Sequence, residues 1–402
     1  MRFIHLSDTH FDYSPAMNYI DMEKYSKEKY DAFQRAIDYA KENNIKLIVH
    51  SGDVFDRINP KLSYVHELMK LLYKGTKDGL TFLIISGNHD QPKVRDSFNP
   101  LSLYDGIDGI HIFTTTQIFT FEDTDFFCIP SPREWSKFSD TFEETLNNLL
   151  EKEKDKDKMK VLVTHIQILN TRDKSTDEIE PFIANGLSPD KIPRIFNYVA
   201  LGHIHKFQQI ADRPEMYYAG SLTPLSFNEI GQKKYFIDID VEKNQETKIT
   251  PIESNVNYKL IQEKIDVNGI TSEEDIENLV DYYIKNIELQ NNVFKIIFEN
   301  ATDIFYREYD SQKLTQKMKK ENVLGFKVEI KRKEENLKED FEKIDITSDD
   351  LIQPLSVELK DYFKMKNETD DEINKLLDLN NKILLRWKNV DKRNQNEKLY
   401  EI

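Results

Sequence analysis

The stretch LIVHSGDVFD at residues 47–56 is an apolar run that stops at Ser51 and Gly52 and ends in carboxylates. A short apolar run bounded by glycine is typical of a buried strand in a parallel sheet. Ligands of open α/β sheets collect where such strands end, so Asp53 is the first candidate for a functional side chain. Gly-Asp by itself is also ordinary turn chemistry, and the other strand ends decide between the two interpretations.

Four other apolar runs end in the same way. The runs at residues 2–6, 81–85, 161–163 and 198–201 lead into SDTH, SGNHD, TH and GHIH. A single polar residue at a strand end is usually a hydrogen-bonded turn residue, but five such strand ends in one chain indicate a shared site. The candidate residues are Asp8, His10, Asp53, Asn88, His89, His165, His203 and His205.

The remaining histidines are interpreted as structural. His5 and His50 fall within apolar runs, His66 falls on a predicted helix and His111 in a short predicted strand. Burial is expected to lower the pKa of each, because a charged imidazole loses its hydration inside a protein.

The candidate side chains offer carboxylate, amide and imidazole groups but no thiolate. That mixture suits divalent ions such as Mn²⁺, Fe²⁺ or Zn²⁺. Even without His89 the set is too large for one ion that must keep positions open for water and substrate, so two ions are expected. A carboxylate can bridge two ions, and Asp53 is the natural bridge.

The order of the motifs DTH, GDVFD, GNHD, THI and GHIH resembles the signature of the calcineurin-like metallophosphoesterase superfamily. Within it, MRFIHLSDTHF, YVALGHIHKFQQI and YYAGSLTPLSF resemble the SbcD-type nuclease subunit of the double-strand-break repair complex, which is related to the meiotic-recombination-eleven protein. The resemblance covers residues 1–241 by motif and the remainder by architecture. Asp56 departs from it, because several archaeal relatives have a histidine there, so that histidine's phosphate-handling role is not carried over.

The resemblance implies an Mn²⁺-dependent DNA nuclease, a 3′–5′ exonuclease on duplex ends and an endonuclease on single strands, with two ions per chain. It implies that His89 contacts the scissile phosphate and stabilises or protonates the departing oxygen; the alternative is a histidine that only orients a ligand. The expected ligand sets share Asp53: Asp8, His10 and His205 for one ion, and Asn88, His165 and His203 for the other.

Two rival functions fit parts of the sequence. One is a metallophosphoesterase for another substrate, a cyclic nucleotide or a phosphoprotein, and the GNHD motif and the long C-terminal extension favour the nuclease over it. The other is a non-catalytic scaffold of the same fold, against which the complete ligand set argues.

The composition allows two or three domains, with 402 residues and 39% apolar content. A formal charge of −16 argues against a protein that coats DNA, although bound cations can supply local positive charge.

Cys128 is the only cysteine in the sequence, so an intrachain disulfide is excluded, and it is expected in a strand. No signal peptide and no apolar run of membrane-spanning length is recognised, so a cytoplasmic protein is expected.

The predicted fold is α/β: a metallophosphoesterase β-sandwich flanked by helices, with a small α+β capping domain and a C-terminal helical hairpin. Residues 1–241 are predicted as the nuclease domain. Residues 250–332 follow a β-α-β-α-β pattern and, by the resemblance, cap the nuclease and help to orient DNA. The rest is predicted as a charged linker at 333–348, the hairpin at 349–390 and a tail at 391–402.

Two helical stripes follow the first two motifs. The stripe of Tyr30, Phe33, Ile37 and Ala40 predicts a crossover helix whose apolar face is core. The second stripe either packs on the sheet or, by the resemblance, forms a homodimer contact together with the segment near Phe98, Leu101 and Tyr104. Its members are Leu62, Val65, Leu68, Met69 and Leu72.

The hairpin at 349–390 is predicted to bind a partner. Its two apolar faces are each about three or four turns long, and isolated helices of that length are marginal in water. Packing on the cap is the alternative, and the charged linker weighs against it. By the resemblance the partner is an SMC-like coiled-coil ATPase of the SbcC type, which the helices would bind through Leu359, Phe363, Leu377, Leu384 and Trp387.

Overall fold

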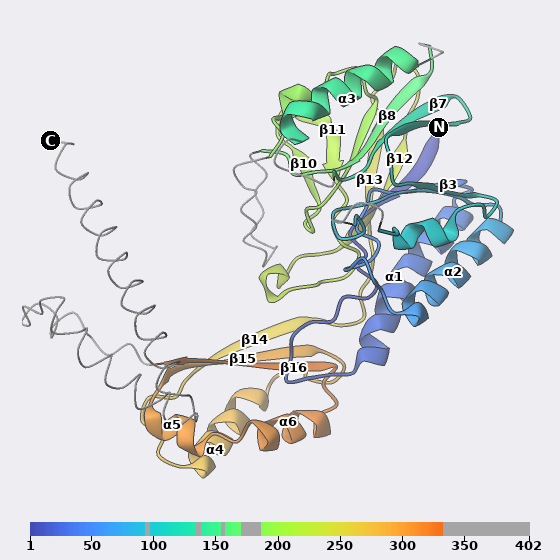
Figure 1. The fold of residues 1–402 in the computed structure, drawn as a ribbon. Helices are drawn as coiled ribbons and strands as arrows, with labels where there is room; N and C mark the ends of the chain where they lie inside the picture. The colour runs from blue at the N-terminus through green and yellow to red at the C-terminus, as the bar shows by residue number, and fades with distance from the viewer. Residues whose placement is uncertain (93–96, 133–137, 154–156, 170–185, 333–402) are drawn as a thin grey trace, which may run out of the picture. The chain divides into compact units, whose positions relative to one another are not determined.

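The computed structural model describes residues 1–92, 97–132, 138–153, 157–169 and 186–332. They form two six-stranded sheets, which pack face to face, and one four-stranded sheet (Figure 1). The linker at 333–348, the hairpin at 349–390 and its five predicted partner-binding residues lie outside the described residues.

The first sheet carries three of the predicted strand ends and has the order β13-β12-β1-β3-β4-β5. Its strands are β1 (Arg2–Leu6), β3 (Leu47–His50), β4 (Thr81–Ile85), β5 (Ile110–Phe113), β12 (Tyr235–Asp240) and β13 (Lys248–Glu253). From β1 through β5 the neighbouring strands are parallel, so their carboxyl ends lie at one edge of the sheet. β12 runs antiparallel to both β1 and β13.

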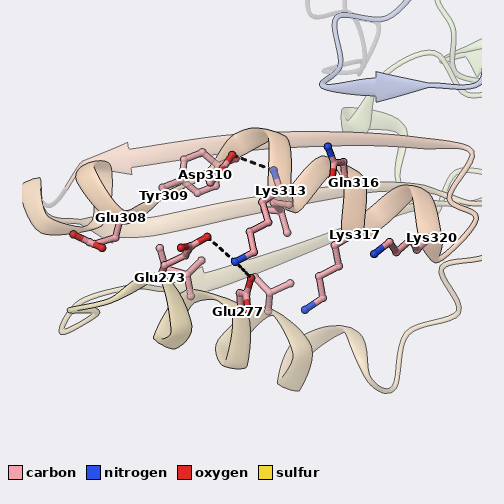
Figure 2. A pocket seen from close by; sticks show the side chains of 12 residues that line it. Glu273, Glu277, Glu308, Tyr309, Asp310, Lys313, Gln316, Lys317 and Lys320 are labelled. Atoms are coloured by element: carbon pink, nitrogen blue, oxygen red, sulfur yellow. Dashed lines mark hydrogen bonds and ion pairs between the residues drawn. The ribbon is translucent and has the colours of Figure 1, made fainter.

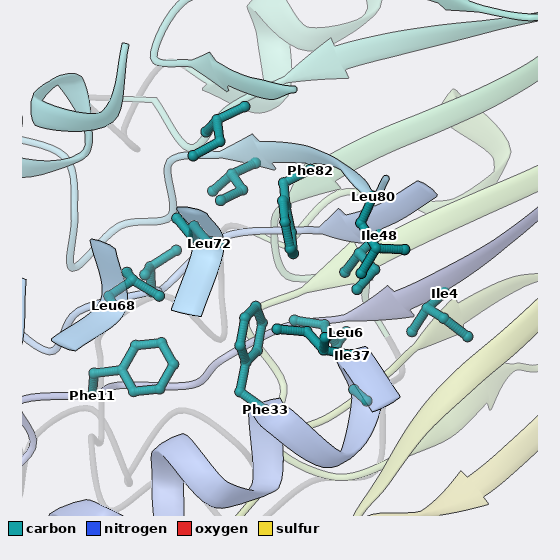
Figure 3. Packing of buried hydrophobic residues seen from close by; sticks show 14 of the residues in the cluster. Ile4, Leu6, Phe11, Phe33, Ile37, Ile48, Leu68, Leu72, Leu80 and Phe82 are labelled. Carbon is teal, nitrogen blue, oxygen red and sulfur yellow. The ribbon is translucent and has the colours of Figure 1, made fainter. Parts of the chain in front are cut away.

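Helices α1 (Met22–Glu42) and α2 (Leu62–Lys77) pack against this sheet together with the 3₁₀ turn η1 (Pro100–Tyr104). α1 begins at Asp21, whose carboxylate accepts the N–H of Lys24, and the predicted apolar stripe faces the core. Figure 3 shows this packing, in which Phe33, Ile37, Leu68 and Leu72 meet Ile4, Leu6, Ile48 and Phe82.

The second sheet carries the other two predicted strand ends and has the order β10-β11-β9-β8-β7-β6. Its strands are β6 (Gln117–Phe121), β7 (Thr124–Ile129), β8 (Met159–His165), β9 (Tyr198–Gly202), β10 (Gln208–Ile210) and β11 (Arg213–Tyr218). Helix α3 (Phe138–Lys152) covers one face through Phe142, Leu146 and Leu149. The other face packs on the first sheet, so the expected β-sandwich flanked by helices is confirmed.

The smaller sheet has the order β14-β15-β16-β2. Its strands are β14 (Leu260–Asp266), β15 (Val293–Ala301), β16 (Gly325–Arg332) and β2 (Tyr19–Ile20). Helices α4 (Glu273–Ile284), α5 (Asp303–Glu308) and α6 (Ser311–Lys320) pack on one face (Figure 1). The β-α-β-α-β pattern is therefore present, whereas α5 and the fourth strand β2 were not expected from the sequence.

A groove of about 350 Å³ lies between α4 and α6 and is crossed by ion pairs (Figure 2). Lys313 Nζ lies 2.8 Å from a carboxylate oxygen of Glu273 and 2.6 Å from one of Glu277. These groups neutralise one another at the surface, which is the usual arrangement of a solvated helix pair. The groove holds none of the predicted ligands.

The residues of the expected dimer contact divide into two groups: Leu62 and Phe98 are 80% and 61% exposed, so a contact through them stays a prediction, whereas the others fill the core. Val65, Leu68 and Leu72 are buried against the sheet, and Leu101 and Tyr104 are fully buried in the same core. The Tyr104 hydroxyl donates to the Val65 carbonyl at 3.0 Å, which ties η1 to α2 within one chain. The alternative, packing on the sheet, is confirmed for these residues because a side chain that fills the chain's own core cannot also contact a second copy.

The structural histidines behave as expected where they are buried. Burial lowers the pKa of His5 to about 3 and that of His50 to about 3, and it also lowers the pKa of His111. His66 was also expected to be buried, but it is exposed on α2. Cys128 lies in β7 as predicted. Within the described ranges, no helix combines the length and apolarity that a membrane crossing requires.

Candidate metal centre

The five predicted strand ends meet at one edge of the sandwich. The loop after β1 is bonded to the loop after β3, since the N–H of Asp8 donates to the Gly52 carbonyl at 3.0 Å and the N–H of His10 to the Asp53 carbonyl at 3.1 Å. The N–H of His203, after β9, donates to an Asp8 carboxylate oxygen at 3.0 Å. Main-chain hydrogen bonds therefore join the loops after β1 and β3, and the Asp8 carboxylate joins them to the loop after β9.

Several residues at this edge have left-handed backbone conformations. φ is +51° at Asp8, +41° at His10, +57° at Asp53 and +107° at His203. Such conformations are uncommon outside glycine, and each costs of order 1–3 kcal/mol unless the surroundings impose it. These left-handed residues are concentrated among the predicted ligands. Such a concentration is typical of a site in which the surrounding structure fixes the backbone and thereby orients the side chains.

A glycine makes room for the bridge candidate. A Cβ placed on Gly87 would lie 2.1 Å from Asp53 Oδ1, a distance that no side chain tolerates. The loops after β3 and β4 can therefore approach closely enough to bury Asp53, which is 2% exposed.

The orientation of His165 follows from its two ring nitrogens. Nδ1 lies 2.8 Å from the Ser51 carbonyl and is the natural donor to it. Nε2 then points at the oxygens of two other candidates, 3.1 Å from Asp53 Oδ2 and 2.9 Å from Asn88 Oδ1. His203 approaches the same Asn88 oxygen with Nδ1 at 3.1 Å. Asn88, His165 and His203 thus converge beside Asp53, and their binding of one ion stays a prediction.

His10 is the clearest sign of a missing partner. It is 2% exposed, and within the described residues neither of its ring nitrogens makes a hydrogen bond of normal geometry. Nε2 lies 3.7 Å from Asp53 Oδ2 and Nδ1 lies 3.3 Å from Asp56 Oδ1. A buried imidazole without hydrogen bonds is costly, and a metal ion on one nitrogen would remove that cost.

Ligand atoms gather within 4.8 Å of one another in three overlapping groups. One of them, Asp8 with His10 and His205, has the members expected for one ion, whereas another joins Asp8 and Asp53 to His165 and so combines residues assigned to different ions. The third joins His10 and Asp53 to His89, so His89 is also close enough to ligate. Because the donors are oxygen and imidazole nitrogen from buried, converging side chains, they fit borderline divalent ions such as Mn²⁺.

The electrostatics of the centre demand positive charge. Burial alone would raise the pKa of Asp53, but His165 and His89 hold it well below its usual range. Burial alone would lower the pKa of His165, but Asp53 raises it to about 9. The proton on His165 provides the cation that the buried carboxylate requires, which is the role that a divalent ion would take over.

His89 lies at the entrance of the centre. Its N–H donates to Asp53 Oδ1 at 2.9 Å, and its Nδ1 lies 2.8 Å from the Asp56 carbonyl. Its side chain is 22% exposed and its ring centre is 4.9 Å from that of His10. The main chain of His89 therefore orients Asp53, while its ring is accessible from solvent beside the candidate ligands.

Asp90 received no role from the sequence motifs, although it belongs to GNHD. This buried carboxylate accepts the N–H groups of Val54, Phe55 and Gly87 at 3.0, 2.8 and 3.1 Å. It therefore bonds the loop after β3 to the loop after β4. Its place inside the motif was the signal that could have identified it.

Glu229 and Lys234 were also missed. Glu229 closes the 3₁₀ turn η5 (Phe227–Glu229), and the Nδ1 of His205 lies 3.6 Å from its carboxylate. Burial alone would raise the pKa of Glu229, but Lys234 and His205 lower it to about 2. Ser226 and Glu229 have the spacing of a capping box, which signals a turn but not a neighbouring histidine.

Lys29 of α1 is a further buried cation beneath the centre. Its ammonium donates to the His10 carbonyl at 2.6 Å and lies over the rings of Tyr13 and Tyr25. Burial lowers its pKa to about 7, although Asp56 and Asp12 oppose that shift. Its neighbours in the apolar stripe gave no reason to expect a charged group there.

The family model for calcineurin-like phosphoesterases matches residues 1–207, and the chain belongs to this family. The match spans all five strand ends and agrees with the observed sandwich.

Within the family, the relatives are of the Mre11 and SbcD type. The chain is 26% identical to the DNA double-strand break repair protein Mre11 of Saccharolobus solfataricus, over 77% of this chain and 78% of that protein. It is 24% identical to Mre11 of Sulfolobus acidocaldarius over 95% of both. It is 27% identical to the SbcD component of nuclease SbcCD from Staphylococcus epidermidis, over 64% of this chain and 69% of the relative. The resemblance carried by the motifs is thereby confirmed.

Proposed function

We propose that the protein is an Mn²⁺-dependent DNA nuclease of double-strand-break repair, a 3′–5′ exonuclease on duplex ends and an endonuclease on single strands. The observation that carries the proposal is the buried cluster around Asp53, in which Nε2 of His10 makes no hydrogen bond with any described residue. The similarity to Mre11 over 95% of the chain favours DNA over a cyclic nucleotide or a phosphoprotein as substrate.

The proposed ligand sets share Asp53. One ion is held with Asp8, His10 and His205, and the other with Asn88, His165 and His203. The geometry that supports this division is the approach of His10 Nε2 and His165 Nε2 to the same oxygen of Asp53, at 3.7 and 3.1 Å. When bound, such a pair of ions activates a water and neutralises charge on the phosphoryl oxygens.

His89 is the proposed catalytic residue supplied by the chain itself. Its ring is partly exposed at the mouth of the cluster, where a phosphodiester would arrive. A histidine in this position can donate a proton or a hydrogen bond to the departing oxygen. Its hydrogen bond to the Asp56 carbonyl holds the ring in place.

The smaller sheet is proposed to help to orient DNA. Lys295 and Lys327 are paired neighbours on β15 and β16, on the face opposite the one that the helices cover. Lys295 is already paired with Glu329 at 2.6 Å, so this face is a modest site for phosphates and the ions carry the larger share of the attraction.

The function is tested by giving the full-length protein with Mn²⁺ three substrates in parallel: linear duplex DNA with a single-stranded segment, a cyclic nucleotide and a phosphopeptide. Release of nucleotides from the DNA, abolished by chelation, is expected. Hydrolysis of one of the other substrates with intact DNA would assign the centre to another phosphoester. Metal binding without any hydrolysis would favour the non-catalytic scaffold.

The proposed partner is an SMC-like coiled-coil ATPase, since one relative is named as part of the SbcCD nuclease. We propose that Phe363 and Trp387 anchor the hairpin on that partner, because aromatic side chains often dominate such interfaces. Replacing both with alanine is expected to abolish co-purification with the ATPase while Mn²⁺-dependent cleavage of single strands continues. Unchanged association after truncation at Asp345 would contradict the hairpin's role.

A homodimer is also proposed, and sedimentation of the full-length chain tests it.

A further inference from the structure

The groups that lie behind His10, His205 and His165 differ in charge. Behind His10, Nδ1 faces Asp56 Oδ1 at 3.3 Å, and behind His205, Nδ1 faces Glu229 Oε1 at 3.6 Å. Behind His165, Nδ1 faces the neutral carbonyl of Ser51 at 2.8 Å. The histidines grouped with Asp8 are therefore each backed by a carboxylate, whereas His165 is backed by a neutral acceptor.

A carboxylate behind a histidine changes what the histidine offers to a metal. When the Nδ1 proton is directed at a carboxylate, Nε2 keeps its lone pair, the ring orientation is fixed and the imidazole becomes a more basic ligand. A backbone carbonyl fixes the tautomer in the same way but polarises the ring less. The effect on metal affinity is typically about 10–100-fold when such a partner is removed.

Glu229 is built to stay ionised and in place. It is 1% exposed, and its carboxylate contacts the ammonium of Lys234, which is 4% exposed. The same ammonium donates to the His205 carbonyl at 3.0 Å and to Ser221 Oγ at 2.9 Å. A buried ion pair of this kind is costly to form and adds little stability by itself, so its position beside His205 calls for another explanation.

The turn that carries Glu229 is held from both sides. The main-chain N–H groups of Leu225 and Ser226 donate to the carboxylate at 3.3 and 3.2 Å. On the outer side, Phe227 packs against the cluster of Tyr25, Tyr258, Val293 and Leu324, and the Lys295 ammonium lies 5.6 Å from its ring centre. The carboxylate therefore has little freedom to move away from His205.

We propose that Glu229 and Asp56 are positioning residues that selectively strengthen the ion site formed by Asp8, His10 and His205. The inference rests on the proposed ligand sets. It assigns a role to Asp56, for which the family resemblance supplied none, and to Glu229, which lies outside every motif. The ion held by Asn88, His165 and His203 does not depend on either carboxylate.

The test is calorimetric titration of the metal-free, full-length protein with Mn²⁺. Glu229→Gln keeps the shape of the side chain, and its amide oxygen can still accept one of the two main-chain N–H groups. One binding step is expected to weaken by about 10–100-fold and the other to stay within about twofold of the wild type. Asp56→Asn is expected to weaken the same step. Asn88→Ala, which removes a ligand of the other ion, identifies which step this is.

Glu28→Gln is the matched control. Glu28 is a 7% exposed carboxylate that pairs with Arg35 at 2.7 Å and accepts from Asn257, but it contacts none of the proposed ligands. It should lower the melting temperature without changing either Mn²⁺ step. If Glu229→Gln behaves like this control, the proposal is overturned, because the carboxylate then serves only the fold.

Two further outcomes also decide the matter. Equal weakening of both steps by Glu229→Gln would overturn the claimed selectivity. If Glu229→Gln does not fold, Asp56→Asn carries the test, since Asp56 is 20% exposed, and unchanged binding in that variant overturns the proposal. A wild-type protein that binds one ion would contradict the proposed two-ion function instead, and the carboxylates would then be judged on whether that single step weakens.

Discussion

The small sheet and the metal centre use the same backbone conformation for different purposes. In the small sheet, left-handed residues are asparagines at turns and irregularities, with φ near +60° at Asn291, Asn300 and Asn322. Asn300 stands where the pairing of β15 with β16 shifts register, and Asn322 follows the end of α6. Asparagine adopts this conformation at low cost, so local backbone geometry explains these residues completely.

At the metal centre the conformation is occupied by Asp8, His10, Asp53 and His203. They are of residue types that can bind metal ions, and their loops are held by hydrogen bonds from neighbouring loops. A strained residue therefore marks function when its type is explained by chemistry and its conformation is imposed by long-range contacts. Substitutions in the two regions should separate these two uses.

The largest effect is expected for Asp53→Ala. Removing the proposed bridge should abolish both Mn²⁺ steps in calorimetry and reduce nuclease activity to background, because both ions lose a shared ligand. Asn300→Ala, a left-handed residue of the small sheet, should instead cost about 1–2 kcal/mol of unfolding free energy and leave both steps intact. Two normal Mn²⁺ steps in Asp53→Ala would remove the central assignment.

His89→Gln is expected to separate chemistry from binding. Loss of a general acid should lower the cleavage rate by about 10²–10⁴-fold. The affinities for Mn²⁺ and for DNA should match the wild type, since the main-chain N–H to Asp53 is kept. Single-turnover cleavage measures the rate. A normal rate would return His89 to a role in orienting Asp53.

Gly87→Ala tests the close approach beneath the bridge. The new Cβ would meet Asp53 Oδ1 and the Asp53 main chain, so we expect about 1–3 kcal/mol of lost stability together with weakened Mn²⁺ binding. Gly325→Ala in the small sheet is the control, because its Cβ would meet the flexible Met17 side chain at 3.0 Å. Denaturant unfolding and calorimetry measure the two effects. Similar losses of Mn²⁺ binding in both variants would argue against a local effect.

The smallest effect concerns acid sensitivity, which should arise in the sandwich because residues 250–332 contain no histidine. Burial lowers the pKa of His5 to about 3, so the folded protein keeps this ring neutral while the unfolded chain takes up a proton below its ordinary value of 6.5. Stability from this group is present above pH 6.5 and is lost as the pH falls from there toward 3. Between pH 7.5 and 5.5 the loss should be about 1.4 kcal/mol.

His5→Phe should remove that part of the pH dependence. The variant will be less stable throughout, because Tyr198 and Ser51 lose their partner, but its unfolding free energy should fall less between pH 7.5 and 5.5. Urea unfolding with a chelator present measures the difference. An unchanged pH slope would show that His5 titrates normally.

The sequence predicted that the candidate residues would lie together, because each follows an apolar strand and parallel strands bring their ends to one edge. It could not reveal Glu229, because only the folded chain brings the turn at residues 226–229 beside His205. Lys29 was missed for a similar reason, since a lysine on a helix is usually solvated. The helical stripe of α2 shows a different limit of sequence analysis. Periodicity identifies an apolar face, but it does not say whether the chain itself or a second copy covers that face.

The pairing of β2 with β16 limits when the small sheet can be completed during folding. Tyr19 and Ile20 follow the first ligand loop, yet they pair with Phe326 and Gly325 of β16, near the far end of the described chain. Such a pairing closes a very long loop, and loops of that kind form late in folding. During synthesis, β2 cannot form this pairing until Gly325 and Phe326 have left the ribosome. The small sheet is therefore not an independent module, because its edge strand β2 belongs to the N-terminal segment that also supplies Asp8 and His10.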